Sequence, residues 1–170
     1  KGASVDLATI VKELEDIAKL GQERVFDGGA ALVKLQQIEG GFWLHKDKTV
    51  TELCSIKNNP KMLILNDEIE WHDDQVIIWF EYLHEIDAAQ KFLGDLGIKC
   101  GVFSGREKNR DRYLAAFKRG EVRVLLAQPR AGGEGRDMSA ASKIIWYSQT
   151  PDATVRTQAN ERATKMGAKS

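Results

Sequence analysis

Apolar residues along the chain change their spacing near residue 75. Before that point they recur every three or four positions, which is the period of an amphipathic helix. This pattern predicts helices over residues 5–20, 29–38 and 61–71, with Asn59-Pro60 opening the third. A polar connector is predicted between the second and third helices.

From residue 75 onward, short apolar runs alternate with longer amphipathic stretches, which indicates βαβ units and a parallel sheet. The predicted strands are residues 76–80, 98–103, 122–127 and 144–147. The predicted helices are residues 86–96 and 108–118, a short one after Gly135 and a last one that starts near Asp152. Crossovers in such sheets are right-handed, so the carboxyl ends of the four strands should share one edge, where ligands usually bind.

Composition narrows the class of protein. With 170 residues, 42% of them hydrophobic and 29% charged, the chain is typical of one globular domain. Its 25 basic and 25 acidic residues cancel, so any contact with nucleic acid has to be local. Apolar runs are too short to span a membrane and no signal peptide is visible, so a cytoplasmic protein without membrane contact is expected.

Histidines, cysteines and tryptophans add little candidate chemistry. The three histidines and two cysteines share no metal-ligand spacing, so no metal site is predicted. The four tryptophans lie in or beside apolar patterns, which predicts that packing accounts for all of them: Trp43, Trp71, Trp79 and Trp146.

A glycine-rich segment follows the third predicted strand. Gly132, Gly133 and Gly135 would allow tight turns and a close approach of backbone N–H groups to a phosphate. The segment fails as a dinucleotide-binding fingerprint because Met138 stands where the third glycine should be. An ordinary turn between strand and helix is the alternative interpretation.

The last predicted helix carries a second candidate site. Gln158, Arg162 and Lys165 recur at helical spacing, so one face presents an amide and two cations. Such a face suits a phosphate, and the planar fork of arginine can neutralise charge on a transferred phosphoryl group. A solvated basic face without a ligand is the alternative.

Taken in order, these segments resemble the second lobe of superfamily-two helicases, most closely Swi/Snf-type DNA translocases and their phage-borne relatives. Residues 76–80 resemble motif IV, residues 130–135 followed by Ala140-Ala141 resemble motif V, and residues 158–167 resemble motif VI. The resemblance implies a RecA-like three-layer α/β domain with a mostly parallel central sheet and helices on both faces. Residues 59–170 would form this lobe, and residues 1–58 would be a helical segment that leads into it.

The resemblance also implies roles for particular residues. Arg162, assisted by Lys165, would face the γ-phosphate of ATP, and the nucleotide side would include Gly133, Gly135, Asp137 and Gln158. The grip on nucleic acid would include Phe80, Gly105, Arg106, Gln128, Arg130, Ala131 and Gly132. Two positions depart from the family, which commonly has a second arginine in place of Lys165 and a Ser-Thr pair in place of Gln128-Pro129.

The chain shows no GxxxxGK[ST] phosphate cradle, so ATP and Mg²⁺ are expected to be held mainly by a separate N-terminal lobe of the same protein and not by this chain. The isolated chain should therefore not hydrolyse ATP. Double-stranded DNA is the expected second partner, with RNA as an alternative. Two rival functions stay open: a RecA-like binding module that works without ATP, and an unrelated α/β enzyme that binds a nucleotide or cofactor.

Overall fold

A computed structural model describes residues 11, 12, 15, 28–71, 73–131 and 136–164 of the chain. The chain divides into two compact units, residues 1–61 and residues 62–170, and each is described by itself. The helix predicted over residues 5–20 falls largely outside the described residues. Within the described part, none of the helices is long and apolar enough to cross a membrane.

The first unit contains a helix and a small hairpin. Helix α2 (Gly28–Glu39) is followed by strands β1 (Phe42–Leu44) and β2 (Val50–Glu52) and by a single 3₁₀ turn, η1 (Ile56–Asn58). The two strands pair antiparallel, with Phe42 opposite Glu52. The prediction of a polar connector is therefore wrong in part, because the segment contains a hairpin. The second strand escaped prediction because it is only three residues long and carries just one apolar side chain.

Gly41 positions this hairpin relative to α2. Its φ of 80° lies in the left-handed region, and its carbonyl accepts a hydrogen bond from the N–H of Leu53 at 2.8 Å. A Cβ at this position would lie 2.7 Å from Asn59 Nδ2 and 2.7 Å from Cys54 Sγ. Glycine is thus required at this position both by the backbone conformation and by the lack of space.

We expect Gly41→Ala to destabilise the first unit by more than the ~1–2 kcal/mol of left-handed backbone strain, because the added methyl group also collides with neighbours. Hydrogen exchange at the amide of Leu53 measures this loss. Gly97→Ala is the matched control, since Gly97 has a φ of 79° with nothing within 4 Å of an added methyl group. Unchanged protection of Leu53 in Gly41→Ala would contradict the prediction.

The second unit is built on a four-stranded parallel sheet. The strands are β3 (Val76–Trp79), β4 (Cys100–Phe103), β5 (Val124–Ala127) and β6 (Lys143–Trp146), in the spatial order β4-β5-β3-β6. All four predicted strands are present, and their observed bounds differ from the prediction by at most two residues. Strands β3 and β5 are buried on both faces, which explains their continuous apolar runs.

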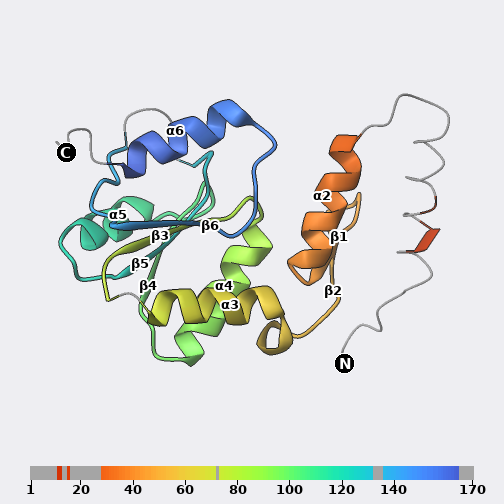
Figure 1. The fold of residues 1–170 in the computed structure, drawn as a ribbon, viewed down its shortest axis with the longest axis horizontal. Helices are drawn as coiled ribbons and strands as arrows, with labels where there is room; N and C mark the ends of the chain where they lie inside the picture. Colours follow the sequence, from red (N-terminus) through yellow and green to blue (C-terminus); the bar gives the residue numbers. More distant parts are fainter. Residues whose placement is uncertain (1–10, 13–14, 16–27, 72, 132–135, 165–170) are drawn as a thin grey trace. The chain divides into compact units, whose positions relative to one another are not determined.

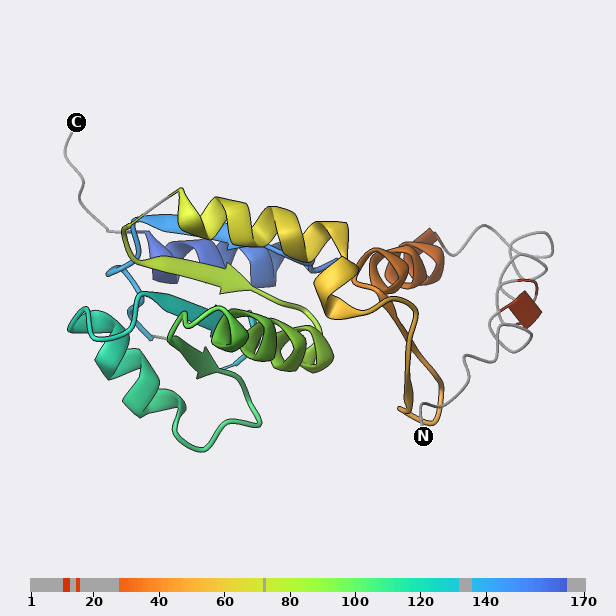
Figure 2. The same cartoon turned by 90° about the horizontal axis from the view of Figure 1, so that it is seen from below.

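Helices cover both faces of this sheet. They are α3 (Pro60–Glu70), α4 (Leu83–Asp95), α5 (Arg110–Lys118) and α6 (Ala153–Ala163). Figures 1 and 2 show α5 and α6 on one face and α3 and α4 on the other. The expected RecA-like three-layer arrangement is therefore confirmed.

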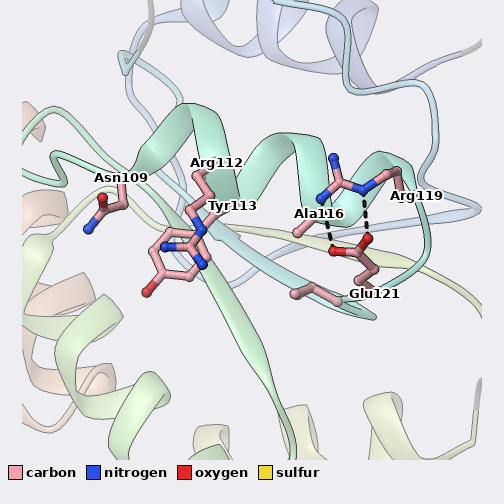
Figure 3. A pocket seen from close by; sticks show the side chains of 7 residues that line it. Asn109, Arg112, Tyr113, Ala116, Arg119 and Glu121 are labelled. Atoms are coloured by element: carbon pink, nitrogen blue, oxygen red, sulfur yellow. Dashed lines mark hydrogen bonds and ion pairs between the residues drawn. The ribbon is translucent and has the colours of Figure 1, made fainter.

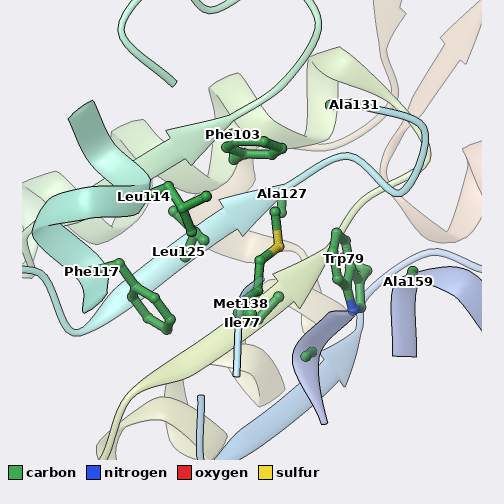
Figure 4. Close-up of a cluster of buried hydrophobic side chains, with 11 residues drawn as sticks. Ile77, Trp79, Phe103, Leu114, Phe117, Leu125, Ala127, Ala131, Met138 and Ala159 are labelled. Carbon is green, nitrogen blue, oxygen red and sulfur yellow. The ribbon is translucent and has the colours of Figure 1, made fainter. Parts of the chain in front are cut away.

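The core beneath α5 and α6 joins the sheet to both helices (Figure 4). Ile77 and Trp79 of β3 pack with Phe117 of α5 and Ala159 of α6 in one buried cluster. Because neighbouring residues of a strand point to opposite faces, Val76 and Ile78 face the other helix layer.

The short helix predicted after Gly135 is wrong for the described residues, since residues 136–142 contain only a turn at Ser139-Ala140. Met138 explains the difference. Its side chain is fully buried in the core, and its N–H donates to the carbonyl of Arg162 at 2.8 Å, so the segment is drawn toward α6 in an irregular conformation.

Candidate functional site

The carboxyl ends of three neighbouring strands are joined by hydrogen bonds at one edge of the sheet. After β3, the N–H of Glu81 donates to Ser148 Oγ, after β6, at 2.7 Å. After β5, the side chain of Gln128 donates from Nε2 to the carbonyl of Glu81 at 3.3 Å. The loops expected to carry ligand contacts are thus held together as one edge.

A buried polar pair supports this edge from below. Glu85 in the first turn of α4 is 2% exposed, and Ser148 is 1% exposed. Ser148 Oγ donates to Glu85 Oε2 at 2.6 Å, so the serine both accepts from Glu81 and donates to Glu85. The sequence did not point to this pair, because the two residues lie 63 positions apart and neither belongs to a recognisable motif.

Ser148→Ala should lower the free energy of unfolding by about 1–3 kcal/mol, because it removes the donor from a buried carboxylate and the acceptor from the N–H of Glu81. Urea unfolding of the chain measures the change. Ser142→Ala is the control, since Ser142 is exposed and its Oγ donates to the carbonyl of Gln75. Equal stability of the two variants would show that the buried pair contributes little.

The loop after β5 contacts both ends of α6. Toward the end of the helix, Arg162 Nη1 donates to the carbonyl of Pro129 at 3.1 Å. At its start, Arg130 Nη2 lies 3.5 Å from Asp152 Oδ2. Asp152 Oδ1 meanwhile caps the helix by accepting from the N–H groups of Thr154 and Val155. Arg162 and Arg130, predicted for different roles, are thus connected through one short loop.

The predicted phosphate-facing side of α6 is present as far as the structure describes it. Gln158 is exposed, and Arg162 lies one turn later and is partly buried. Lys165 lies outside the described residues. Another cation of the helix, Arg156, lies 5.0 Å from the ring centre of Trp146 and bonds to Gln149, so it belongs to a different set of contacts.

Asp137, predicted on the nucleotide side, already has partners. Lys118 Nζ donates to its Oδ2 at 2.9 Å, and the N–H of Ser139 donates to its Oδ1 at 2.9 Å. These hydrogen bonds, first of all the one from Lys118, hold the pKa of the Asp137 carboxyl well below its usual range. In this structure Asp137 therefore ties the end of α5 to the segment before β6.

The residues predicted to grip nucleic acid divide into two groups. Arg130 is 55% exposed and Arg106 is 56% exposed, although Arg106 is paired with Asp87. Gly105 is also exposed. Phe80 and Ala131 are instead buried, at 0% and 4% exposed, and Phe80 packs against the ring of Tyr147. The apolar core therefore continues past the strand ends and includes these two side chains, and contact of their turns with nucleic acid stays a prediction.

Gly132, Gly133 and Gly135 lie outside the described residues, so their predicted contacts stay predictions.

A separate pocket of about 390 Å³ lies along α5 (Figure 3). Arg112, Tyr113 and Arg119 are among its lining residues, and Arg119 is paired with Glu121. None of the predicted site residues lines this pocket.

Comparison with known proteins identifies the family of the lobe. The model of the helicase conserved C-terminal domain matches residues 48–167, which is most of the chain. The chain belongs to this family. The resemblance to the second lobe of superfamily-two helicases, inferred from motifs IV, V and VI, is thereby confirmed.

Relatives with this domain are much longer proteins. An uncharacterized ATP-dependent helicase of Mycoplasma pneumoniae is 26% identical over 159 residues, covering 92% of this chain and 15% of the relative. A chromatin-remodeling ATPase INO80 of Candida glabrata is 27% identical over 124 residues, covering 71% of this chain and 8% of the relative. The chain thus spans less than a sixth of the length of these relatives.

A solved structure supports the fold. The C-terminal part of the Fun30 ATPase domain superposes with a TM-score of 0.60 at 21% identity, covering 73% of this chain and 40% of that one. At this level of identity the likeness concerns the fold, and it agrees with the RecA-like layers of the second unit.

Proposed function

We propose that this chain is the second motor lobe of an ATP-dependent helicase or DNA translocase. It would present Arg162 to ATP held on a separate N-terminal lobe and supply part of the grip on nucleic acid. The observation that carries the proposal is the loop after β5, whose Pro129 and Arg130 contact the two ends of the helix that bears Arg162. Membership of the helicase C-terminal family supports it.

On the nucleotide side, Arg162 and Gln158 lie on α6 with one turn between them, which suits contact with phosphate oxygens. Bound ATP supplies the phosphoryl group, and Mg²⁺ neutralises charge on its oxygens. The described residues contain no group of three or more His, Cys, Asp or Glu residues that could hold a metal ion. We propose that Mg²⁺ is held mainly by the N-terminal lobe and that this chain contributes cations, with Lys165 assisting.

Arg162 Nη1 donates to the carbonyl of Pro129, and a bound phosphate would either replace this partner or be bound in addition to it, because a guanidinium carries five N–H donors. A phosphate oxygen is a stronger partner for this guanidinium than an uncharged carbonyl, because its negative charge attracts the cation and two parallel N–H groups can bind one phosphate. The exchange is therefore favourable once the two lobes close over the nucleotide. In the open state the bond to Pro129 keeps the arginine ordered.

On the nucleic-acid side, Arg130 and Arg106 supply exposed donors near the strand ends, and Gly105 leaves room for a close approach of the backbone. Gln128 is half-buried and holds the loop after β3 through the carbonyl of Glu81. Double-stranded DNA is the proposed ligand, with RNA as the alternative. Contacts of this kind neutralise phosphates without reading sequence, so binding should weaken as salt rises.

Arg162→Ala should lower nucleic-acid-stimulated ATP hydrolysis by about 10³-fold or more in a protein that joins this chain to its N-terminal lobe, while ATP still binds. Arg162→Lys should also lose most activity, since lysine keeps the charge and lacks the planar fork. Lys165→Ala tests whether Lys165, which stands where the family commonly has an arginine, contributes to the contact with phosphate. Arg156→Ala is the control on the same helix and should retain activity.

If ATP is hydrolysed normally by Arg162→Ala, the proposed role of this arginine is wrong. If the joined protein binds nucleic acid but shows no turnover that depends on it, the motor is excluded and the ATP-independent binding module takes its place.

Arg130→Ala should weaken binding of the joined protein to duplex DNA similarly for all sequences and lower the slope of log affinity against log salt by about one. Fluorescence anisotropy at several salt concentrations measures both effects. Arg119→Ala removes a surface arginine that is paired with Glu121 and should leave the slope unchanged. An unchanged slope in Arg130→Ala would exclude a phosphate contact by this residue.

A further inference from the structure

Helix α3 is apolar on two opposite sides. Met62, Leu65 and Ile69 are buried, as their helical spacing predicts. On the opposite side, Ile64 is 61% exposed and Trp71, immediately after the helix, is 85% exposed. The expectation that packing accounts for every tryptophan is therefore wrong for Trp71.

The exposed residues form a continuous row. Residues three, four or seven positions apart lie on the same side of a helix, so Ile64, Asp67 and Trp71 follow one line over two turns, roughly 10 Å long. Leu63, which is 45% exposed, borders this line. We call Leu63, Ile64, Asp67 and Trp71 the α3 patch. An exposed tryptophan beside further exposed aliphatic residues is typical of an interaction site.

Carboxylates surround the patch. Asp67 lies within it, Glu70 flanks it, and Asp73 and Asp74 follow Trp71 closely in the chain. Among the described residues, no cation forms an ion pair with Asp67, Asp73 or Asp74, and Glu70 accepts only from Asn66. The patch thus combines apolar surface with unneutralised negative charge.

Neighbouring cations are already engaged. Lys143 is paired with Glu68, and Arg123 Nη1 donates to the carbonyl of Ile69 at 2.9 Å. Within the part of the chain that the structure describes, Lys143 is therefore taken up by Glu68, and Arg123 is bonded to an uncharged carbonyl and forms no ion pair with Asp67, Asp73 or Asp74. A partner that brings its own cations would gain both apolar contact and ion pairs.

We propose that the α3 patch docks a basic amphipathic helix of another polypeptide. An apolar stripe at positions i, i+3 or i+4 and i+7 would cover Ile64 and Trp71, and flanking lysine or arginine side chains would reach the carboxylates. The acidic rim disfavours nucleic acid and anionic lipid, and it also disfavours a second copy of this chain, because two acidic patches would repel each other. The proposal is independent of the motor function.

The size of the patch sets the strength of this docking. A buried tryptophan contributes roughly 150–250 Å², so the patch is well below the ~800 Å² per partner of a standard interface. A dissociation constant in the micromolar range or weaker is expected, with Trp71 as the main anchor.

The test uses the whole 170-residue chain and a synthetic 18-residue helical peptide of leucine and lysine with one apolar face. Calorimetry should give a dissociation constant that rises at least about tenfold in Trp71→Ala. Trp71→Phe should keep most of the affinity and lose the blue shift of tryptophan fluorescence on binding. Combined Asp67→Asn, Asp73→Asn and Asp74→Asn should weaken binding and reduce its salt dependence.

Two controls distinguish binding at the α3 patch from nonspecific binding of the peptide. Leu96→Ala removes a 50% exposed leucine next to α4 and should leave affinity within about twofold, and a matched leucine–glutamate peptide should not bind. Because Trp71 is exposed, its substitution should cost little stability, and an unchanged unfolding temperature would show that each variant folds. Equal binding by Trp71→Ala, equal binding of the acidic peptide, or self-association of the chain that Trp71→Ala abolishes would each overturn the proposal.

Discussion

Parallel pairing of β3 with both of its neighbours is the constraint on which the rest of the lobe depends. Each residue of β3 is in register with one residue of β5 and one of β6, as when Trp79 lies between Ala127 and Trp146. Because the three strands end at the same level, the segments that follow them emerge side by side. The bonds that join Glu81, Gln128 and Ser148 are a direct result of that register.

The sequence predicted the strands well for a physical reason. A strand buried on both faces needs a continuous apolar run, and Val76–Trp79 and Val124–Ala127 are short runs of this kind between more polar stretches. The hairpin of the first unit was missed because Val50–Glu52 is exposed, partly buried and exposed in turn, with one apolar residue. Trp71 shows the opposite error, since an aromatic residue next to a buried helix face does not itself have to be buried.

Site residues that lie on one helix could be predicted from the sequence, whereas contacts between residues that are distant in the chain could not. The spacing of Gln158 and Arg162 on α6 is a local property that the sequence contains. The bond from Arg162 to Pro129 joins residues 33 positions apart, and Ser148 to Glu85 spans 63, so neither follows from local pattern. Phe80 belongs to the apolar run 76–80 that predicted the first strand, and its packing against Tyr147, 67 positions later, likewise joins segments that are distant in the sequence.

Asp152 divides its carboxylate between two tasks. One oxygen caps α6 through Thr154 and Val155, and the other lies near Arg130. When an incoming anion draws Arg130 away, only the second oxygen loses its partner, and the first turn of the helix keeps its cap. The loop can therefore exchange one counter-ion for another without fraying the helix beside it.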